Sequence, residues 1–322
     1  MAAVSEVLRV AKTEGASRPS LERIELFINP LAGHVGPGAA AEAQAILGEF
    51  DLQAHVRTPA PEQLSRELKA AVEAGPDLVI VLAGDGTARS AASHCGADGP
   101  LLAPLAGGTM NMLPHALYGP NSWQAALRET LERGVVRPVS GGEVDGQRFH
   151  VAAIIGPPAL WAEVREAART HRLITAWRKA GVAWERTFRN HVTFSLDGGA
   201  TQRAEALSLI CPLVSRAMPD DEPLLEVAAL HTASLTDAMR LGMHALLSEV
   251  IGDWRNDPSV EVTRRRSGMV WAEGGHVHAV LDGEPMRLGR RVKVGFVPVA
   301  FRALAPAQQE AKPEAVSSIL PG

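Results

Sequence analysis

Two glycine-rich turns, each directly after an apolar run, constrain the fold of this chain more than any other feature. The apolar run 78–82 ends in the sequence AGDGT at residues 83–87, and residues 88–93 have a composition compatible with a helix. A second apolar run, at 101–105, ends in AGGTMN. Strand, tight turn and helix in this order let backbone N–H groups and a helix N-terminus approach an anion closely, so the unit suits a phosphate.

Asp85 lies inside the first turn, where a bare carboxylate would repel phosphate. The simplest explanation is a divalent cation between the two groups. In the second turn, Thr109 and Asn111 bring side-chain hydrogen-bonding groups to the same edge. One glycine-rich turn alone is equally well explained as an ordinary loop whose glycines permit positive φ. Two turns in series, each after a strand, favour a binding function.

The first part of the chain alternates between strand-like and helix-like segments. In order, strands and helices are expected at residues 24–28, 39–50, 53–57, 61–74 and 78–82. Such alternation predicts a parallel, doubly wound sheet. Ligands bind beyond the carboxyl ends of the strands in such a sheet. Asn29 and the two glycine-rich turns all follow strand ends, so they are expected to converge on one cleft.

After Gly134 the sequence is dominated by strand-like segments separated by Asp-Gly and Gly-Gly pairs, which predicts a mostly antiparallel second domain. One of these strands is expected at 148–155, and helices are expected at 161–182 and 235–250. The predicted fold class is therefore an α/β nucleotide-binding domain followed by a β-rich domain, with the active site in the cleft between them. The expected boundaries are a disordered tail at 1–20, the α/β domain at 21–138, the β-rich substrate domain at 139–297, a segment packing back on the α/β domain at 298–306, and a disordered tail at 307–322.

Composition excludes several classes of function. The 322 residues carry a net charge of −4, which gives no electrostatic argument for binding nucleic acid. The two cysteines, Cys95 and Cys211, lie far apart and form no metal-binding set, which favours a reduced, cytoplasmic setting. No run approaches the roughly 20 apolar residues that span a bilayer, and residues 1–20 lack the apolar core of a signal peptide. Membrane contact is therefore expected to be peripheral, at the inner membrane face.

Four segments in this order resemble the signatures of the diacylglycerol kinase catalytic-domain family. They are NPLAG at 29–33, AGDGT at 83–87, PLAGGTMN at 104–111 and LDGE at 281–284. The family includes bacterial lipid kinases and sphingosine kinases and is distantly similar to NAD kinases. The resemblance runs from about residue 24 to residue 306. It implies transfer of the γ-phosphate of ATP, with Mg²⁺, to a hydroxyl of a lipid such as diacylglycerol presented at a membrane surface; a homodimer is left open.

The resemblance also implies roles for individual residues. Asp282 is expected to act as general base, while Asp85 and Glu284 serve the metal and the reaction. By itself, the pair Asp282-Gly283 is a standard signal for a hairpin turn. The nucleotide would be bound by Asn29, Gly33, Gly84, Gly86, Thr87, Gly107, Gly108, Thr109 and Asn111.

Some positions depart from the family pattern. Ala83 replaces a glycine, and Arg89 and Ser90 stand where an asparagine and a glutamate are common. Pro157-Pro158-Ala159 stands where the family often has an aspartate. A polar contact and an auxiliary metal site are therefore expected to be altered or missing.

Two other functions stay open on the sequence. One is a non-catalytic nucleotide- or lipid-binding protein on a degenerate kinase fold, and the other is a kinase of a soluble acceptor. The presence of both Asp85 and Asp282 argues against a pure binding protein, because such a protein needs no base.

Overall fold

The computed structural model describes residues 19–156, 191–215, 217–231, 255, 257–272 and 275–307. The helices expected at 161–182 and 235–250 lie outside these residues, as does the segment Pro157-Pro158-Ala159.

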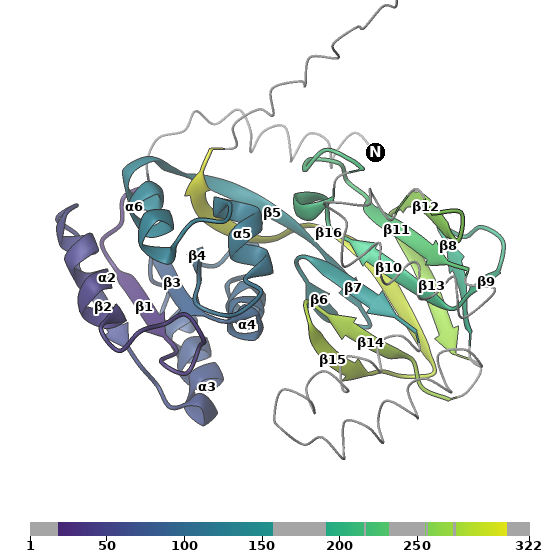
Figure 1. The fold of residues 1–322 in the computed structure, drawn as a ribbon, viewed down its shortest axis with the longest axis horizontal. Coiled ribbons are helices and arrows are strands. Elements are labelled where there is room, and N and C mark those ends of the chain that lie inside the picture. The colour runs from purple at the N-terminus through teal and green to yellow at the C-terminus, as the bar shows by residue number, and fades with distance from the viewer. Residues whose placement is uncertain are drawn as a thin grey trace, which may run out of the picture.

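An α/β domain forms the first part of the chain (Figure 1). Its central sheet has the parallel order β2-β1-β3-β4. The elements are β1 (Ile24–Ile28), α2 (Ala39–Gly48), β2 (Ala54–Arg57), α3 (Pro61–Glu73), β3 (Leu78–Ala83), α4 (Asp85–Cys95), β4 (Leu101–Ala106), α5 (Met112–Tyr118) and α6 (Trp123–Arg133). The predicted doubly wound sheet is confirmed, and α5 was not predicted.

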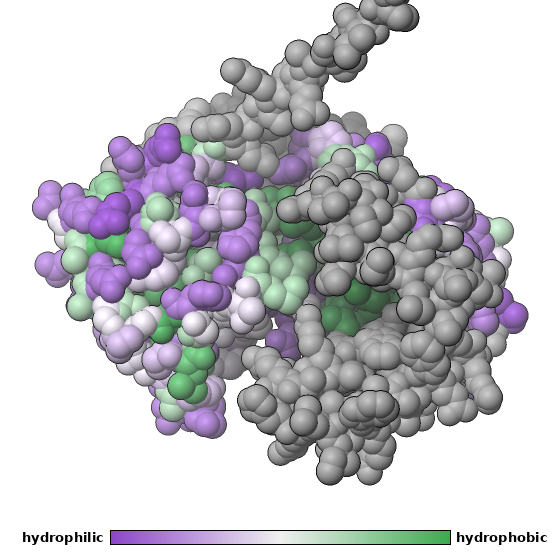
Figure 2. Space-filling model, viewed as in Figure 1, coloured by the Kyte–Doolittle hydropathy of each residue, from purple (hydrophilic) through white to green (hydrophobic). Residues whose placement is uncertain are grey.

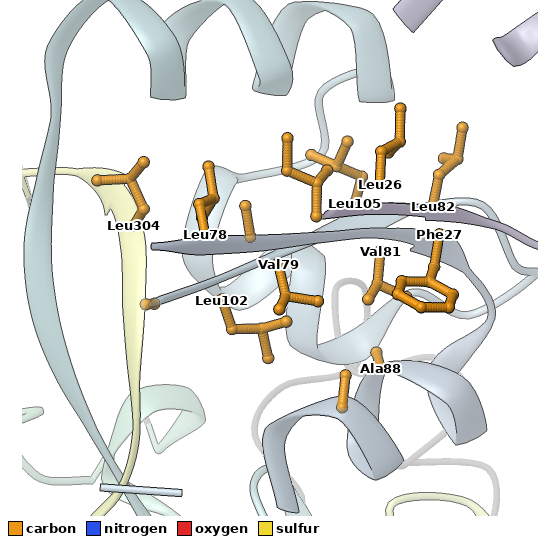
Figure 3. Packing of buried hydrophobic residues seen from close by; sticks show 14 of the residues in the cluster. Leu26, Phe27, Leu78, Val79, Val81, Leu82, Ala88, Leu102, Leu105 and Leu304 are labelled. Carbon is orange, nitrogen blue, oxygen red and sulfur yellow. The ribbon is translucent and has the colours of Figure 1, made fainter. Parts of the chain in front are cut away.

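The core of this domain is built around β3, whose six residues are all buried. A central parallel strand is covered on both faces, and this explains why its sequence is a continuous apolar run. Figure 3 shows side chains from β1, β3 and β4 packed together, with Ala88 of α4 beneath them. Helix α3 covers the sheet with Leu64 and Leu68, which lie one turn apart on its buried face.

The second domain is a sandwich of antiparallel strands. One sheet has the order β12-β11-β10-β7-β14-β15, and the other continues from the first domain through β16, β13, β8 and β9, with β5 and β6 also attached. The strands are β5 (Gly134–Val144), β6 (Gln147–Phe149), β7 (Ala152–Ile155), β8 (Val192–Leu196), β9 (Gln202–Ala204), β10 (Ala206–Ile210), β11 (Leu225–Leu230), β12 (Val260–Arg265), β13 (Ser267–Ala272), β14 (His278–Leu281), β15 (Glu284–Arg287) and β16 (Arg291–Pro306). A second hydrophobic cluster fills the space between the sheets.

Two long strands, β5 and β16, join the domains and pair with each other along most of their length (Figure 1). The pairing shifts register between Val297 and Phe301. Beyond this irregularity, β16 lies beside β4, with Ala303 opposite Leu102 in parallel register. The last residues of β16 therefore add a strand to the first domain's sheet. The domain boundaries themselves stay a prediction.

Three hairpin turns use an Asp-Gly pair with positive φ at both residues. They are Asp145-Gly146 between β5 and β6, Asp197-Gly198 between β8 and β9, and Asp282-Gly283 between β14 and β15. Positive φ at two consecutive residues gives the turn whose twist matches that of antiparallel strands, and Asp-Gly is a preferred pair for it. The hairpin signal at Asp282 is thus confirmed.

The single strand expected at 148–155 is wrong, because the chain leaves regular pairing between β6 and β7. The backbone N–H groups of His150 and Val151 donate to the carboxylate of Asp282. A side chain distant in sequence therefore interrupts the strand.

No helix within the described ranges is both long and apolar enough to cross a bilayer. In Figure 2 the outer face of the first domain is largely polar, while apolar surface gathers toward the middle of the view.

Candidate active site

The loop after β1 is held in place by its own polar groups and by the second glycine-rich turn. Asn29 accepts a hydrogen bond on its side-chain oxygen from the backbone N–H of Leu31, at 3.0 Å. The N–H of His34 donates to the carbonyl of Gly107 at 2.9 Å, and its ring Nδ1 contacts the carbonyl of Gly108. His34 was not predicted as a site residue. A polar loop residue next to a glycine-rich segment was its only signal in the sequence.

The first glycine-rich turn leads directly from β3 into α4. Gly84 is the N-cap residue, so Asp85 and Gly86 occupy the first turn of the helix. The first N–H groups of a helix have no carbonyl partner within the helix, and its positive dipole end faces the same way. This end of α4 is therefore suited to bind phosphate, and Thr87 lies one residue further along.

Asp85 caps the next helix. Its Oδ2 accepts a hydrogen bond from the N–H of Asn111 at 2.9 Å, and its Oδ1 accepts one from the N–H of Met112 at 2.7 Å. Met112 begins α5, so the carboxylate satisfies N–H groups at the start of that helix. No local sequence signal predicts this partner, which lies 26 residues away. The metal-binding role of Asp85 stays a prediction.

The second glycine-rich turn packs against the first so closely that no side chain fits between them. A Cβ on Gly108 would lie 2.7 Å from the Cα of Gly84, and a Cβ on Gly107 would lie 2.8 Å from the backbone nitrogen of Ala83. These glycines are thus required by backbone packing, whatever they bind.

Asn111 closes the second turn. It adopts a left-handed conformation with φ of 51°, which asparagine tolerates better than most residues. Its side chain accepts from the N–H of Gly108 at 2.7 Å and donates to the carbonyl of the same residue at 2.8 Å. Thr109 is exposed, and its Oγ1 lies 3.7 Å from a Cβ built on Gly33. The loop after β1 and the second turn therefore share one edge.

Asp282 is buried, with 6% of its surface exposed, in the turn between β14 and β15. Its Oδ2 accepts from the N–H of His150 at 2.8 Å, and its Oδ1 accepts from the N–H groups of Val151 at 2.9 Å and Ala152 at 3.0 Å. A carboxylate offers about four lone-pair sites, so roughly one remains, on Oδ2. That site can accept a proton from a substrate hydroxyl.

Burial raises the pKa of Asp282 above its ordinary value, while the three N–H donors and the charge of Arg89 act in the opposite direction. A raised pKa is what a carboxylate needs to serve as a base near neutral pH. His150 stays neutral, since burial and the charges of Arg89 and Arg148 lower its pKa to about 3.

Glu284 brings the second domain against the first. It is exposed, and its Oε1 would lie 2.9 Å from a Cβ built on Gly86. The hairpin that carries Asp282 therefore meets the start of α4. The structure brings together three of the four signature segments by backbone contacts, and the fourth through Glu284.

Arg89, one of the departures from the family pattern, extends from α4 toward the second domain. Its Nη1 donates to the carbonyl of Arg148 at 3.4 Å. The positive charge of Arg89 acts to lower the pKa of both Asp282 and His150. The sequence pattern shows only that Arg89 is unusual for the family, and it does not predict the contact with Arg148.

Comparison with known proteins finds a family match in the first domain. Residues 23–144 match the model of the diacylglycerol kinase catalytic domain. The resemblance is thereby confirmed for the region that holds three of the four signature segments, and LDGE at 281–284 lies outside it. The matched region contains the first domain with both glycine-rich turns and reaches the end of β5.

Solved structures assigned as diacylglycerol kinases of Bacillus anthracis str. Sterne have the same fold. Three of them share 17%, 16% and 16% identity with this chain, with TM-scores of 0.63, 0.65 and 0.66. Each comparison covers 89% of this chain and 98% of the other. At this identity the likeness establishes the fold, an α/β domain followed by a β-rich domain, and not the substrate. No curated protein sequence matches the chain.

Proposed function

We propose that the protein is an ATP-dependent lipid kinase that transfers the γ-phosphate of ATP to a lipid hydroxyl, with diacylglycerol as the model acceptor. The contact between Glu284 and Gly86 is the observation that carries this proposal. It puts a helix N-terminus suited to phosphate beside the hairpin that holds a buried carboxylate. Phosphoryl transfer needs these two features in one place, since catalysis depends on positioning the phosphates and on relieving the acceptor of its proton.

In the proposed reaction, the ATP phosphates are held by N–H groups of the first turn of α4 and of Thr109, because the N–H groups of Gly107 and Gly108 already donate to the carbonyl of Ala83 and to the side chain of Asn111. The acceptor hydroxyl gives its proton to Oδ2 of Asp282 as its oxygen bonds to the γ-phosphorus. The bond from that phosphorus to the bridging oxygen breaks, and ADP leaves. Because an alcohol is a weak acid, the base matters chiefly as the proton departs in the transition state.

The residues fit a magnesium ion held largely by the nucleotide. Among the described residues, no three His, Cys, Asp or Glu side chains group together as a metal site of their own. Mg²⁺ is usually bound through one or two carboxylates together with substrate phosphates. Glu284 is the exposed carboxylate beside the phosphate-binding turn, so it would hold the ion. Asp85 would be the second ligand, through the lone pairs that its two capping bonds leave. When bound, the metal neutralises charge on the phosphates.

A non-catalytic nucleotide-binding protein is the competing proposal. In its favour, both oxygens of Asp85 are already bonded to the backbone, and Arg89 and Ser90 replace the usual residues.

The deciding experiment incubates the protein with labelled ATP, Mg²⁺ and a total lipid extract, and then separates the products. A labelled phospholipid supports the lipid kinase. Calorimetry with ATP, with and without Mg²⁺, is run in parallel. Nucleotide binding without transfer to any lipid or soluble acceptor would favour the non-catalytic protein instead.

A further inference from the structure

A cluster of positive charge lies where the β14–β15 hairpin passes into β16. Arg287, Arg290, Arg291 and Lys293 occur within seven residues, and all four are exposed. Within the described part of the chain, none of them forms an ion pair. The whole chain has a net charge of −4, so this concentration of cations is local.

A tryptophan lies in the same surface. Trp271 on β13 is directly opposite Arg291 on β16, and the guanidinium lies 5.6 Å from the centre of its ring. The neighbouring pair Val270 and Val292 is fully buried between the two sheets. Because successive residues of a strand point to opposite faces, Trp271, Arg291 and Lys293 lie on the outer face.

The surface is close to the candidate active site. Strand β15 begins at Glu284, which meets Gly86 in the cleft, and ends at Arg287. At about 3.3 Å per residue, three steps along the strand span about 10 Å. The cleft and the cationic surface are therefore connected by one short, hydrogen-bonded hairpin.

We propose that the surface formed by Trp271, Arg290, Arg291 and Lys293, here called the basic face, docks the protein on an anionic lipid bilayer. Arginine and lysine are attracted to anionic headgroups, each by roughly 1 kcal/mol near the surface. Tryptophan is favoured at the level of the headgroups, where its ring is buried and its N–H stays wet. The purpose of docking rests on the proposed lipid kinase activity, since it would bring the cleft to its acceptor.

One carboxylate moderates the basic face. Oδ2 of Asp145 would lie 4.0 Å from a Cβ built on Gly289, in the middle of the cationic segment. Asp145 is exposed in the β5–β6 turn, and the described residues include no side-chain partner for it. Removing its charge should strengthen binding to an anionic surface, and a gain of this kind cannot result from misfolding.

The test is sedimentation with vesicles of phosphatidylcholine, with and without phosphatidylglycerol. The full chain should bind the anionic vesicles only, and salt should weaken the binding. The double variant R290Q/R291Q should lower the partition coefficient about 30-fold, because each arginine contributes about 5-fold and the two factors multiply. The matched control R66Q/K69Q removes the same two positive charges, but from the exposed face of α3. It should bind anionic vesicles as tightly as the wild type does. D145N should bind up to about 5-fold more tightly.

Equal losses in R290Q/R291Q and in R66Q/K69Q would show that only net charge matters, and would overturn the proposal. A second result would also overturn it. If neither the wild type nor R290Q/R291Q binds vesicles, and R290Q/R291Q has lost a binding to duplex DNA that the wild type shows, the basic face would be a nucleic-acid site. The vesicle-binding assay measures no turnover, so a failure of docking can be distinguished from a failure of the proposed kinase activity. With that activity, R290Q/R291Q should keep its kcat on a short-chain, monomeric diacylglycerol and lose activity on anionic vesicles.

Discussion

Replacing Asp282 with asparagine should abolish most activity at a modest cost in stability. The carboxylate accepts three backbone hydrogen bonds, whereas an asparagine side chain has only one acceptor atom. If the amide oxygen takes the place of Oδ1, the N–H groups of Val151 and Ala152 stay paired and that of His150 faces an NH₂ donor. Leaving a buried N–H without an acceptor costs about 1–3 kcal/mol. The opposite orientation of the amide would leave the N–H groups of Val151 and Ala152 without an acceptor and is therefore disfavoured.

The loss of activity in D282N should be larger than the loss of stability. General-base catalysis typically contributes ~100- to 10,000-fold, or about 3–5 kcal/mol of barrier. We expect kcat to fall by that factor while ATP affinity, measured by calorimetry, changes little. Activity is measured with labelled ATP and a short-chain diacylglycerol, and stability by urea unfolding. A folded D282N protein with full turnover would refute the assignment of the base.

Asp197 offers a matched control for the turn. Its φ of 48° equals that of Asp282, and its carboxylate also accepts backbone N–H groups, from Arg266 and Ser267. It is exposed and lies in the β8–β9 turn, away from the cleft contact. D197N should cost less than about 1 kcal/mol, because water can replace the lost partner, and should leave kcat unchanged.

The pH dependence separates a base from a purely structural carboxylate. Since burial raises the pKa of Asp282, the ionised base is lost as the pH falls through that raised pKa, and kcat/KM should fall with it. For stability the sign is reversed. A carboxyl with a raised pKa in the folded state stabilises the fold most below its ordinary pKa of 3.8, and this contribution is lost as the pH rises through the folded-state pKa. The stability deficit of D282N should therefore shrink with rising pH, and a pH-independent activity deficit would indicate a structural role.

The contacts of the glycine-rich turns give three further predictions. Gly108→Ala should destabilise the protein by about 1–3 kcal/mol in urea unfolding, because its Cβ would lie 2.7 Å from the backbone of Gly84. Gly86→Ala should change stability by less than about 0.5 kcal/mol, since its Cβ would meet Oε1 of Glu284, at the end of a flexible side chain. The same variant should lower kcat at least tenfold, because it displaces Glu284. A wild-type kcat in this variant would disprove the cleft contact. Asp85→Ala should cost about 0.5–2 kcal/mol through the lost cap of α5, and an unchanged midpoint would contradict that role.

Local sequence signals predicted the first domain well. Strands β3 and β4 are short apolar runs bounded by glycine, proline or aspartate, and helix α3 has a clear buried face. The missed helix α5 has seven residues, includes Pro114, and takes its cap from Asp85. That information is tertiary, so no window around α5 contains it. Strands β9 and β15 were missed because they are three and four residues long and mostly polar.

The candidate site was predictable in its parts and not in its contacts. The Asp-Gly signal predicted the turn at Asp282, and the family resemblance predicted that this turn would face the nucleotide. Neither predicted that the carboxylate would bind the backbone between β6 and β7, because that backbone lies some 130 residues earlier. The roles of His34 and Arg89 depend in the same way on residues brought close only by folding.

The structure gives several signature residues a role in the fold. Gly108 allows two turns to touch, Asp85 starts a helix and Asp282 ties a hairpin to the neighbouring strand. A protein that had lost catalysis would still keep these residues for its fold, so their presence alone does not establish an enzyme. Glu284 is different, because the described residues offer its exposed carboxylate no hydrogen bond or ion pair. Its place against Gly86 has no structural purpose that the fold requires, and this is why that contact, more than the glycines, supports a kinase.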